Sequence, residues 1–376
     1  MSARFIVPFL LALLLLPSAA LAQERPYVEE QRLLKARVIS ATETIERLVP
    51  GTTIVTDTQA LTVEVLEGTD EGRVVTFEND YTQLKDGDVI YVRHIVGGFD
   101  LETWAVADAY RLDILLWIGI AFLILVCVFG GWQGIRGLAS LAGSLVLIFY
   151  LLLPGIHGGY SPILVSLGVA SLIIVIGSYV THGFTKTTTS AMLGMLATIA
   201  VTGAATWLVI WATRLSGYSS EENAYLNFAT SGSIDMVGLL FGGIMIGLLG
   251  VLYDSAIGQA VAVEELYVAS KDYTRVQVYR RALRIGREHI GALVNTLAIA
   301  YVGASLPLLL LLKTSTASPL YLLNSELFAT EIIRILMGSI GVVIAVPLTT
   351  LIAVSLLKGV RERASHGHSH AHAHHH

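Results

Sequence analysis

Long apolar runs follow one another through the last two thirds of the chain, and they constrain its fold more than any other feature. Each run is close to the ~20 residues that a helix needs to cross a hydrocarbon core of ~30 Å. The runs are 114–130, 137–154, 161–181, 190–211, 234–255, 290–312 and 332–357. Only 14% of the 376 residues are charged, against about 25% in a typical soluble protein. We therefore predict an α-helical membrane protein with about seven transmembrane helices.

The first 22 residues, MSARFIVPFLLALLLLPSAALA, have the organisation of a secretory signal. A positive start at Arg4, an apolar stretch and a small-residue ending at Ala20-Leu21-Ala22 predict cleavage before Gln23. An uncleaved anchoring helix is the alternative. A cleavable signal would export the segment that follows it.

Residues 23–109 are polar, mixed in charge and rich in β-strand signals. Leu61, Val63 and Val65 alternate with polar residues in ALTVEVLEG, which predicts a strand with one buried face. An Asp86-Gly87 turn precedes the strand-like stretch DVIYVRHIV. We predict one small, β-rich extracytoplasmic domain, a barrel or a sandwich. Its sequence shows no Cys/His metal spacing and no nucleophile motif.

Basic residues predict the orientation of the helices. If the β-rich domain lies outside, the loops near 131–136, 182–189 and 256–287 lie inside. Those loops carry Arg136, Lys186, Lys271, Arg275, Arg280, Arg281, Arg284 and Arg287, whereas the outer loops carry Arg214 and Lys313. This asymmetry follows the positive-inside rule. The predicted parts are a signal peptide (1–22), the β-rich domain (23–109), a transmembrane domain (110–358) and a cytoplasmic basic, His-rich tail (359–376).

Composition and motifs argue against several classes of function. The lone cysteine, Cys127, excludes intrachain disulfides, and a net charge of −5 gives no support to nucleic acid as a partner. The sequence contains no H-E-x-x-H, G-x-S-x-G or G-x-x-x-x-G-K-[ST] motif. Tyr253-Asp254 is similar to half of an intramembrane aspartyl protease site, but no G-x-G-D lies on another apolar run. We therefore expect neither an enzyme nor a bound cofactor.

The fifth apolar run contains an aspartate, Asp254, in a stretch that is otherwise apolar or small from Met236 to Val263. A helix of these 28 residues is about 42 Å long, more than the ~30 Å hydrocarbon core. Asp254 shares one helix face with a stripe of four glycines, and such faces let helices approach closely. The glycines are Gly243, Gly247, Gly250 and Gly258.

Two interpretations of Asp254 stay open. A helix that breaks or bends near Gly258 would line a polar cavity, as discontinuous helices do in secondary transporters. A straight, tilted helix would place Asp254 about 28 Å from Asp235, near the cytoplasmic surface, where water hydrates it. A carboxylate that faces lipid costs at least ~2.5–3.5 kcal/mol near the bilayer centre, so we favour a partly wet pocket against the sixth helix.

The sixth run supplies candidate partners for Asp254. Glu288, Gly291 and Asn295 fall on one helix face, and His289 begins a neighbouring row. Both rows start at the cytoplasmic end, as Asp254 does. The four polar residues together predict an ion or substrate site, because carboxylates, an amide and an imidazole can bind a cation or relay protons. The alternative is that Glu288 and His289 only end the cytoplasmic loop.

Two further patterns indicate helix packing. Small and hydroxyl residues recur in the fourth run at Ser190, Gly194, Thr198, Thr202 and Thr206. Such a row predicts close packing with interhelical hydrogen bonds more strongly than a pore lining. In the seventh run, the i, i+3 spacing of Glu331 and Arg334 predicts an intrahelical ion pair.

The C-terminal sequence SHGHSHAHAHHH holds seven of the eleven histidines. Neutral imidazoles at this density predict weak binding of a divalent metal such as Zn²⁺, Ni²⁺ or Cu²⁺. The candidate ligands are His366, His368, His370, His372 and His374. An engineered end would explain the same residues.

Three segments resemble the recurring blocks of the YibE/F-like membrane proteins. They are YRLDILLWIGIAFLILVCVFGGWQGIRGLASLAGSL, GLLFGGIMIGLLGVLYDSAIGQAVAVEEL and GREHIGALVNTLAIAYVGASLPLLLLL. The resemblance covers about residues 110–360 and, more weakly, the β-rich region. It implies a multipass protein of the bacterial inner membrane, and it brings no established activity or site residues.

These patterns favour a secondary transporter or exporter that moves a small solute or ion, coupled to a proton or cation, across the lipid bilayer. The alternative is a non-transporting membrane scaffold whose extracytoplasmic domain binds an envelope partner. Seven helices are more than such an anchor needs, since one would hold the domain in place.

Overall fold

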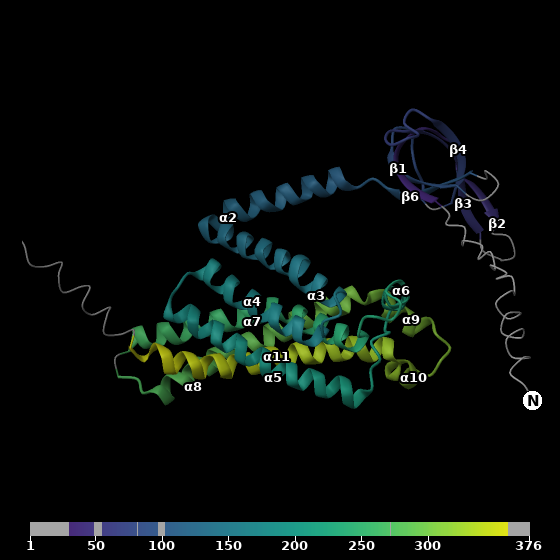
Figure 1. Ribbon diagram of the computed structural model, residues 1–376. Helices are drawn as coiled ribbons and strands as arrows, with labels where there is room; N and C mark the ends of the chain where they lie inside the picture. The colour runs from purple at the N-terminus through teal and green to yellow at the C-terminus, as the bar shows by residue number, and fades with distance from the viewer. Residues whose placement is uncertain (1–29, 49–54, 81, 97–101, 271, 360–376) are drawn as a thin grey trace, which may run out of the picture. The chain divides into compact units, whose positions relative to one another are not determined.

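The computed structural model describes residues 30–48, 55–80, 82–96, 102–270 and 272–359, which belong to two compact units (Figure 1). The first unit spans residues 1–123 and the second residues 124–376. The predicted signal peptide (1–22) and the histidines of the tail lie outside the described residues.

The first unit contains an antiparallel sheet of six described strands. They are β1 (Glu30–Ala41), β2 (Ile45–Leu48), β3 (Val55–Val65), β4 (Val74–Asn79), β5 (Val89–Val96) and β6 (Glu102–Ala109). The strand order is β2-β3-β1-β5-β6, and β4 also pairs with β3. The sheet curls, so that β4 lies close to β6 at its other edge (Figure 1). The prediction of a small β-rich region is therefore confirmed.

Alternating side chains form the core of this unit. Leu61, Val63 and Val65 on β3 are buried, as their spacing predicts, together with Ile90 and Val92 of β5. Strand β1 pairs with β3 on one side and with β5 on the other. The predicted Asp-Gly turn is also present. Gly87 takes the left-handed φ of +91°, which a residue with a Cβ rarely adopts.

Helices make up the rest of the described chain. They are α2 (Leu112–Leu147), α3 (Leu153–His157), α4 (Pro162–His182), α5 (Lys186–Thr213), α6 (Glu221–Ala229), α7 (Met236–Ala269), α8 (Arg275–Ala304), α9 (Leu306–Thr314), α10 (Pro319–Asn324) and α11 (Glu326–Leu356). At the start of several helices, a side chain accepts a hydrogen bond from a backbone N–H of the first turn and so caps the helix. Thr185 begins α5, Asp235 begins α7, and Thr274 begins α8 in a capping box with Gln277.

The seven predicted apolar runs all fall in described helical stretches, although the count of candidate spans by stretch is lower. Among the described helices, five stretches are long and apolar enough to cross a membrane, or six if the bent pair α8 and α9 counts as one span. The predicted runs 114–130 and 137–154 belong to one helical stretch, Leu112–His157. Gly131 interrupts that stretch, with non-helical φ and ψ of 53° and −143°. Two helical segments therefore meet at a kink at Gly131, and the two predicted runs lie on either side of it (Figure 1).

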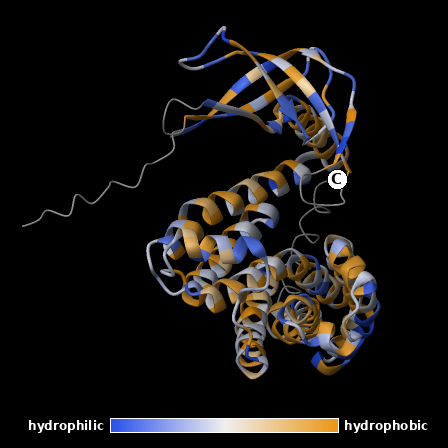
Figure 2. Cartoon of the chain, turned by 90° about the vertical axis from the view of Figure 1, so that its right-hand side faces the viewer, coloured by the Kyte–Doolittle hydropathy of each residue, from blue (hydrophilic) through white to orange (hydrophobic). Residues whose placement is uncertain are grey.

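The core of the second unit lies where α5, α7 and α11 pack together. Helix α11 contacts α5, α7 and α8, and α4 packs on α5 and α7. Phe241, Leu248 and Met195 are among its fully buried side chains. Hydrophobic residues predominate along most of the long helices, as in a lipid-embedded bundle (Figure 2). The apolar helices thus define a multipass α-helical membrane protein.

Candidate functional site

Asp254 lies on the face of α7 that points away from the core of the second unit. Its side chain is exposed, as are Gly243, Gly247, Gly250 and Gly258 along the same stripe. The neighbours Leu252 and Ala256 are fully buried on the opposite side of the helix. A single chain therefore does not enclose Asp254 in a pocket, and of the stripe glycines only Gly247 approaches another described helix, at Tyr301 of α8.

The predicted partners on α8 are also exposed. Glu288, His289 and Asn295 all point outside the helix packing of the described unit. No ion pair of the described residues includes Asp254, Glu288 or His289. The structure therefore does not bring these side chains into contact, and their role as an ion site stays a prediction.

The four residues of the predicted ion site, Asp254, Glu288, His289 and Asn295, nevertheless lie at a similar level of the bundle. Helices α7 and α8 pack side by side and run in opposite directions, because Gln259 contacts Ala282 near one end and Gly247 faces the Tyr301 hydroxyl near the other. Asp254 lies between these two contacts, level with the part of α8 around Gly291. Glu288 and Asn295 are each within about one helical turn of that level.

The broken helix lies elsewhere than predicted. Helix α7 continues through Gly258 without interruption, so of the two interpretations the straight helix is the one that the structure shows. The break falls between α8 and α9, whose axes differ by 64° around Ser305. The Ser305 hydroxyl donates to Glu331 at 3.2 Å, and Glu331 pairs with Arg334 at 2.7 Å. The predicted intrahelical ion pair is confirmed, and it also contacts the break.

A buried glutamine, Gln259, forms the best-connected polar contact inside the helical unit. Its Nε2 donates to the carbonyl of Ala282 on α8 and to the hydroxyl of Thr350 on α11, both at 2.8 Å. Gly286 leaves room for the amide, since a Cβ there would overlap the Gln259 side chain. Gln259 is not among the site residues predicted from the sequence. The feature that could have indicated it is an uncharged amide on an apolar helix, on the face opposite the glycine stripe.

The hydroxyl row of α5 is buried, as the packing interpretation predicts. Ser190 and Thr198 donate to carbonyls of their own helix, at 2.7 and 2.8 Å. Gly194 lies so close to Thr349 of α11 that a Cβ would overlap it. The expected interhelical hydrogen bonds are not seen at Thr202 and Thr206, whose hydroxyls are buried without a partner among the described residues.

Several buried hydroxyls in this unit lack a hydrogen-bond partner among the described residues. The group comprises Ser166 and Ser178 on α4, Thr202 and Thr206 on α5, and Thr330 and Thr349 on α11. A buried hydroxyl without a partner costs about 1–3 kcal/mol, so a natural protein rarely keeps several without water or another ligand to bind them. The interior of the bundle therefore offers unused hydrogen-bonding groups.

A hollow of about 410 Å³ lies at the end of α5 where the hydroxyl row begins. It is lined by Tyr179, Phe184, Thr185, Lys186, Thr189 and Leu356. The rings of Tyr179 and Phe184 stack at 4.4 Å, and the Tyr179 and Thr189 hydroxyls are 3.2 Å apart. The Lys186 ammonium and the first N–H groups of α5 make this end electropositive.

The opposite end of the α5–α11 interface is closed by a carboxylate. Glu326 at the start of α11 accepts hydrogen bonds from the backbone N–H groups of Ser216, Gly217 and Tyr218, at 2.7–3.1 Å. The Ser216 hydroxyl donates to the same carboxylate. Glu326 therefore ties the loop after α5 to α11.

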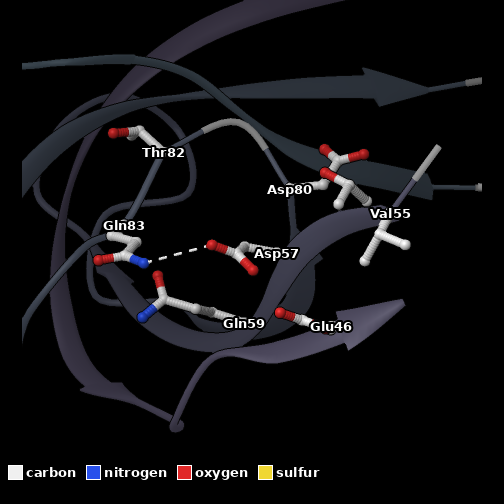
Figure 3. A pocket seen from close by; sticks show the side chains of 8 residues that line it. Glu46, Val55, Asp57, Gln59, Asp80, Thr82 and Gln83 are labelled. Atoms are coloured by element: carbon white, nitrogen blue, oxygen red, sulfur yellow. Dashed lines mark hydrogen bonds between the residues drawn. The ribbon is translucent and has the colours of Figure 1, made fainter. Parts of the chain in front are cut away.

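The β-rich unit has a hollow of its own, of about 500 Å³ (Figure 3). Glu46, Asp57 and Asp80 supply three carboxylates, and polar side chains line the rest. Gln83 points toward Asp57, which accepts a hydrogen bond from its Nε2 at 3.5 Å (Figure 3). Because the lining holds no basic side chain, the hollow is electronegative.

A second polar cluster of this unit surrounds His94. The imidazole is buried and stacks on Trp104, with ring centroids 4.0 Å apart. Asp70 and Glu102 lie 3.5 and 3.7 Å from its two nitrogens. Arg73 pairs with both carboxylates, and its hydrogen bond is the main cause that lowers the pKa of the Glu102 carboxyl.

The comparisons with known proteins agree with the fold. The apolar helices and the β-rich unit define the class, a multipass α-helical membrane protein with a small antiparallel β-sheet domain. The family model of the YibE/F-like protein matches residues 118–359, so the chain belongs to the YibE/F-like family. No curated protein and no solved structure matches the chain.

Proposed function

We propose that this protein is a secondary transporter or exporter of a small solute or ion, driven by coupled movement of a proton or cation. The observation that carries the proposal is the set of buried, unpartnered hydroxyls inside the helical unit. A protein that served only as an anchor gains nothing from such groups, whereas a solute path needs them to replace the hydration shell of its cargo.

The interface between α5 and α11 is the proposed path. The electropositive hollow beside Lys186 lies at one end, and the Glu326 contacts lie at the other. Thr198, Thr202 and Thr206 follow one another along α5 between these ends and are fully buried. In the state described here the interface is closed, since Gly194 and Thr349 are in close contact. Transport then requires α5 and α11 to separate, as alternating access does in other transporters.

The exposed polar residues at the shared level of α7 and α8 are proposed to couple transport to the movement of a proton or cation. Asp254, Glu288 and His289 can each exchange a proton, and Asn295 adds an amide oxygen for a cation. The proposed location is the bacterial inner membrane, with the β-rich unit outside and the C-terminus in the cytoplasm, in line with the distribution of Lys and Arg between the loops.

Charge movement in proteoliposomes tests this proposal. The full chain is reconstituted, and currents are recorded on a solid-supported membrane after jumps in proton, divalent metal or small-anion concentration. Thr206→Val removes an interior hydroxyl with little change of shape, and it should lower the current at least tenfold. Thr213→Val removes a hydroxyl that bonds its own helix at an exposed site, and it should leave the current unchanged. Asp254→Asn should abolish coupling to protons.

Retention of the full current in Thr206→Val would overturn the proposed path. Retention of proton coupling in Asp254→Asn would overturn the proposed coupling site alone. Absence of current for every jump would favour the second candidate function.

That second candidate is a membrane scaffold whose β-rich unit binds a basic envelope partner. The electronegative hollow of Glu46, Asp57 and Asp80 favours it, because a cationic side chain would find three carboxylates there. Rescue of a deletion phenotype by a secreted 23–109 segment alone would establish this function. Rescue that requires the helices would exclude it.

A further inference from the structure

The glycines of the helical unit divide into two groups according to what surrounds them. Those that point inward are explained by close contacts. A Cβ would overlap Thr349 at Gly194, Ser166 at Gly242 and Leu248 at Gly341. At such positions only glycine lets the helices approach, as small residues do in membrane proteins generally.

Three of the four stripe glycines of α7 have no such explanation within the described residues. At Gly243, Gly250 and Gly258 no atom lies within 4 Å of an added Cβ, and at Gly247 only the Tyr301 hydroxyl is near. Glycine lowers the stability of a helix by roughly 1 kcal/mol relative to alanine. Three of them without such a contact, on one exposed face, are therefore unfavourable in an isolated copy of the chain.

Asp254 makes the same face unsuitable for lipid. The carboxylate is exposed in the middle of this stripe and belongs to no ion pair of the described chain. A carboxylate that faces lipid costs at least about 2.5–3.5 kcal/mol at the bilayer centre, and less toward the surface. The charge therefore favours protein or water over lipid on this face, and the small residues leave room for a helix to come close.

We propose that this face of α7 is the contact surface between two copies of the chain in the membrane. A twofold axis along the membrane normal keeps both copies at the same depth and lays α7 of each copy against α8 of the other. Asp254 then lies at the interface, at the level of the exposed α8 residues around Gly291. The proposal does not rest on transport.

Charge complementarity identifies a second copy as the occupant. Helix α7 carries Asp254, Glu264 and Glu265 and has no Lys or Arg. Helix α8 carries five arginines and one acid: Arg275, Arg280, Arg281, Arg284, Arg287 and Glu288. None of these side chains forms an ion pair within the described residues. In a dimer with α7 of each copy against α8 of the other, the acidic helix of one copy thus meets the basic helix of the second copy.

The glycines of α8 fit the same arrangement. Gly291 and Gly303 are exposed, and no atom lies within 4 Å of an added Cβ at either position. Two small-residue faces can meet at the short axial distance that supports interhelical packing in lipid. A site composed of Asp254 and the α8 residues Glu288 and Asn295 would then be completed only by the second copy.

The first test measures the oligomeric state of the full chain in lipid nanodiscs by native mass spectrometry. The wild type should be a dimer. Gly250→Leu fills the stripe and should raise the dissociation constant at least tenfold, while the open space around it allows the chain itself to fold. Gly168→Leu is the matched control, since Gly168 is exposed on α4 with no atom within 4 Å of its Cβ position, and it should leave the dimer intact.

Cysteine cross-linking in the Cys127→Ala background provides a second measurement. Val261 is exposed one heptad beyond Asp254 on the same face, so Val261→Cys should form a disulfide between copies. Leu208→Cys, at an exposed position on α5, should not. A monomeric wild type, a dimer that Gly250→Leu leaves unchanged, or cross-linking of Val261→Cys to a different protein in native membranes would each overturn the proposal.

Discussion

Gln259 on α7 donates its side-chain amide to the hydroxyl of Thr350 on α11 at 2.8 Å, in the buried interior of the helical unit. The Thr350 hydroxyl in turn donates a hydrogen bond to the carbonyl of Val346 at 2.6 Å, and Gln259 also donates to the carbonyl of Ala282 on α8. Three helices therefore meet at one amide. Such a contact fixes their relative position more firmly than apolar packing alone, because a displaced amide would be left unsatisfied.

Replacement of this amide should destabilise the bundle. Gln259→Leu keeps much of the volume but removes the donor, so the Ala282 carbonyl loses a partner. We expect unfolding to become easier by about 1–3 kcal/mol, the cost of an unmet buried hydrogen bond. The measurement is thermal unfolding in detergent, followed by tryptophan fluorescence. Asn295→Leu is the control, because that amide is exposed on α8 and should tolerate the change. Equal midpoints for the two variants would contradict the assigned role of Gln259.

A second prediction concerns the close approach of α5 and α11. Gly194→Ala introduces a Cβ that overlaps both the backbone and the side chain of Thr349. Overpacking of this kind costs about 1–3 kcal/mol. Gly168→Ala adds the same methyl group in open space and should be neutral or slightly stabilising. Thermal unfolding of both variants checks the contrast, and a tolerated Gly194→Ala would show that the two helices do not touch at this point.

The sequence located the helices of the second unit, but it did not show which face of each helix points inward. Run length and hydropathy located α4, α5, α7 and α11, because these depend on the chain alone. Which face of α7 turns inward could not be derived, since the helix is apolar on both sides and lacks the polar stripe that marks the outside of a soluble helix. The glycine stripe looked like a packing face, whereas Leu248 and Leu252 on the other side form the core.

The candidate site was predicted in part for the same reason. Sequence spacing put Asp254 and Glu288 at nearby levels, which the antiparallel packing of α7 and α8 supports. It could not show that both side chains point outward. Gln259 was missed because a single amide carries no periodic signal. The intrahelical pair of Glu331 and Arg334 was predicted correctly, because an i, i+3 contact requires only one helix.

The Glu326 contacts lead to a third prediction. Glu326→Ala removes the acceptor for three backbone N–H groups of the loop after α5, and we expect that loop to detach from α11. Hydrogen exchange of residues 215–218 should rise at least tenfold. Glu222→Ala, at an exposed position in the following helix α6, should leave this exchange unchanged. Unaltered protection in Glu326→Ala would mean that the loop is held by other contacts.

The last prediction concerns the acid stability of the β-rich unit. The hydrogen bond from Arg73 lowers the pKa of the Glu102 carboxyl below its ordinary value of 4.5. A depressed folded pKa contributes stability that is fully present above the unfolded pKa and is lost as the pH falls through the folded pKa. The unit should therefore lose stability as the pH drops below about 4.5.

Glu102→Gln removes the ionisable carboxyl and should flatten this acid limb. Arg73→Leu removes the partner of both Glu102 and Asp70 and should flatten it at least as much. The double variant should add little to Arg73→Leu, because the contact between Arg73 and Glu102 is lost in both single variants. The measurement is the thermal midpoint of the full chain between pH 3 and 7, followed by the fluorescence of Trp104 with the other tryptophans replaced by phenylalanine. An acid limb that survives in both single variants would assign the loss to other carboxylates, such as Asp70 beside His94.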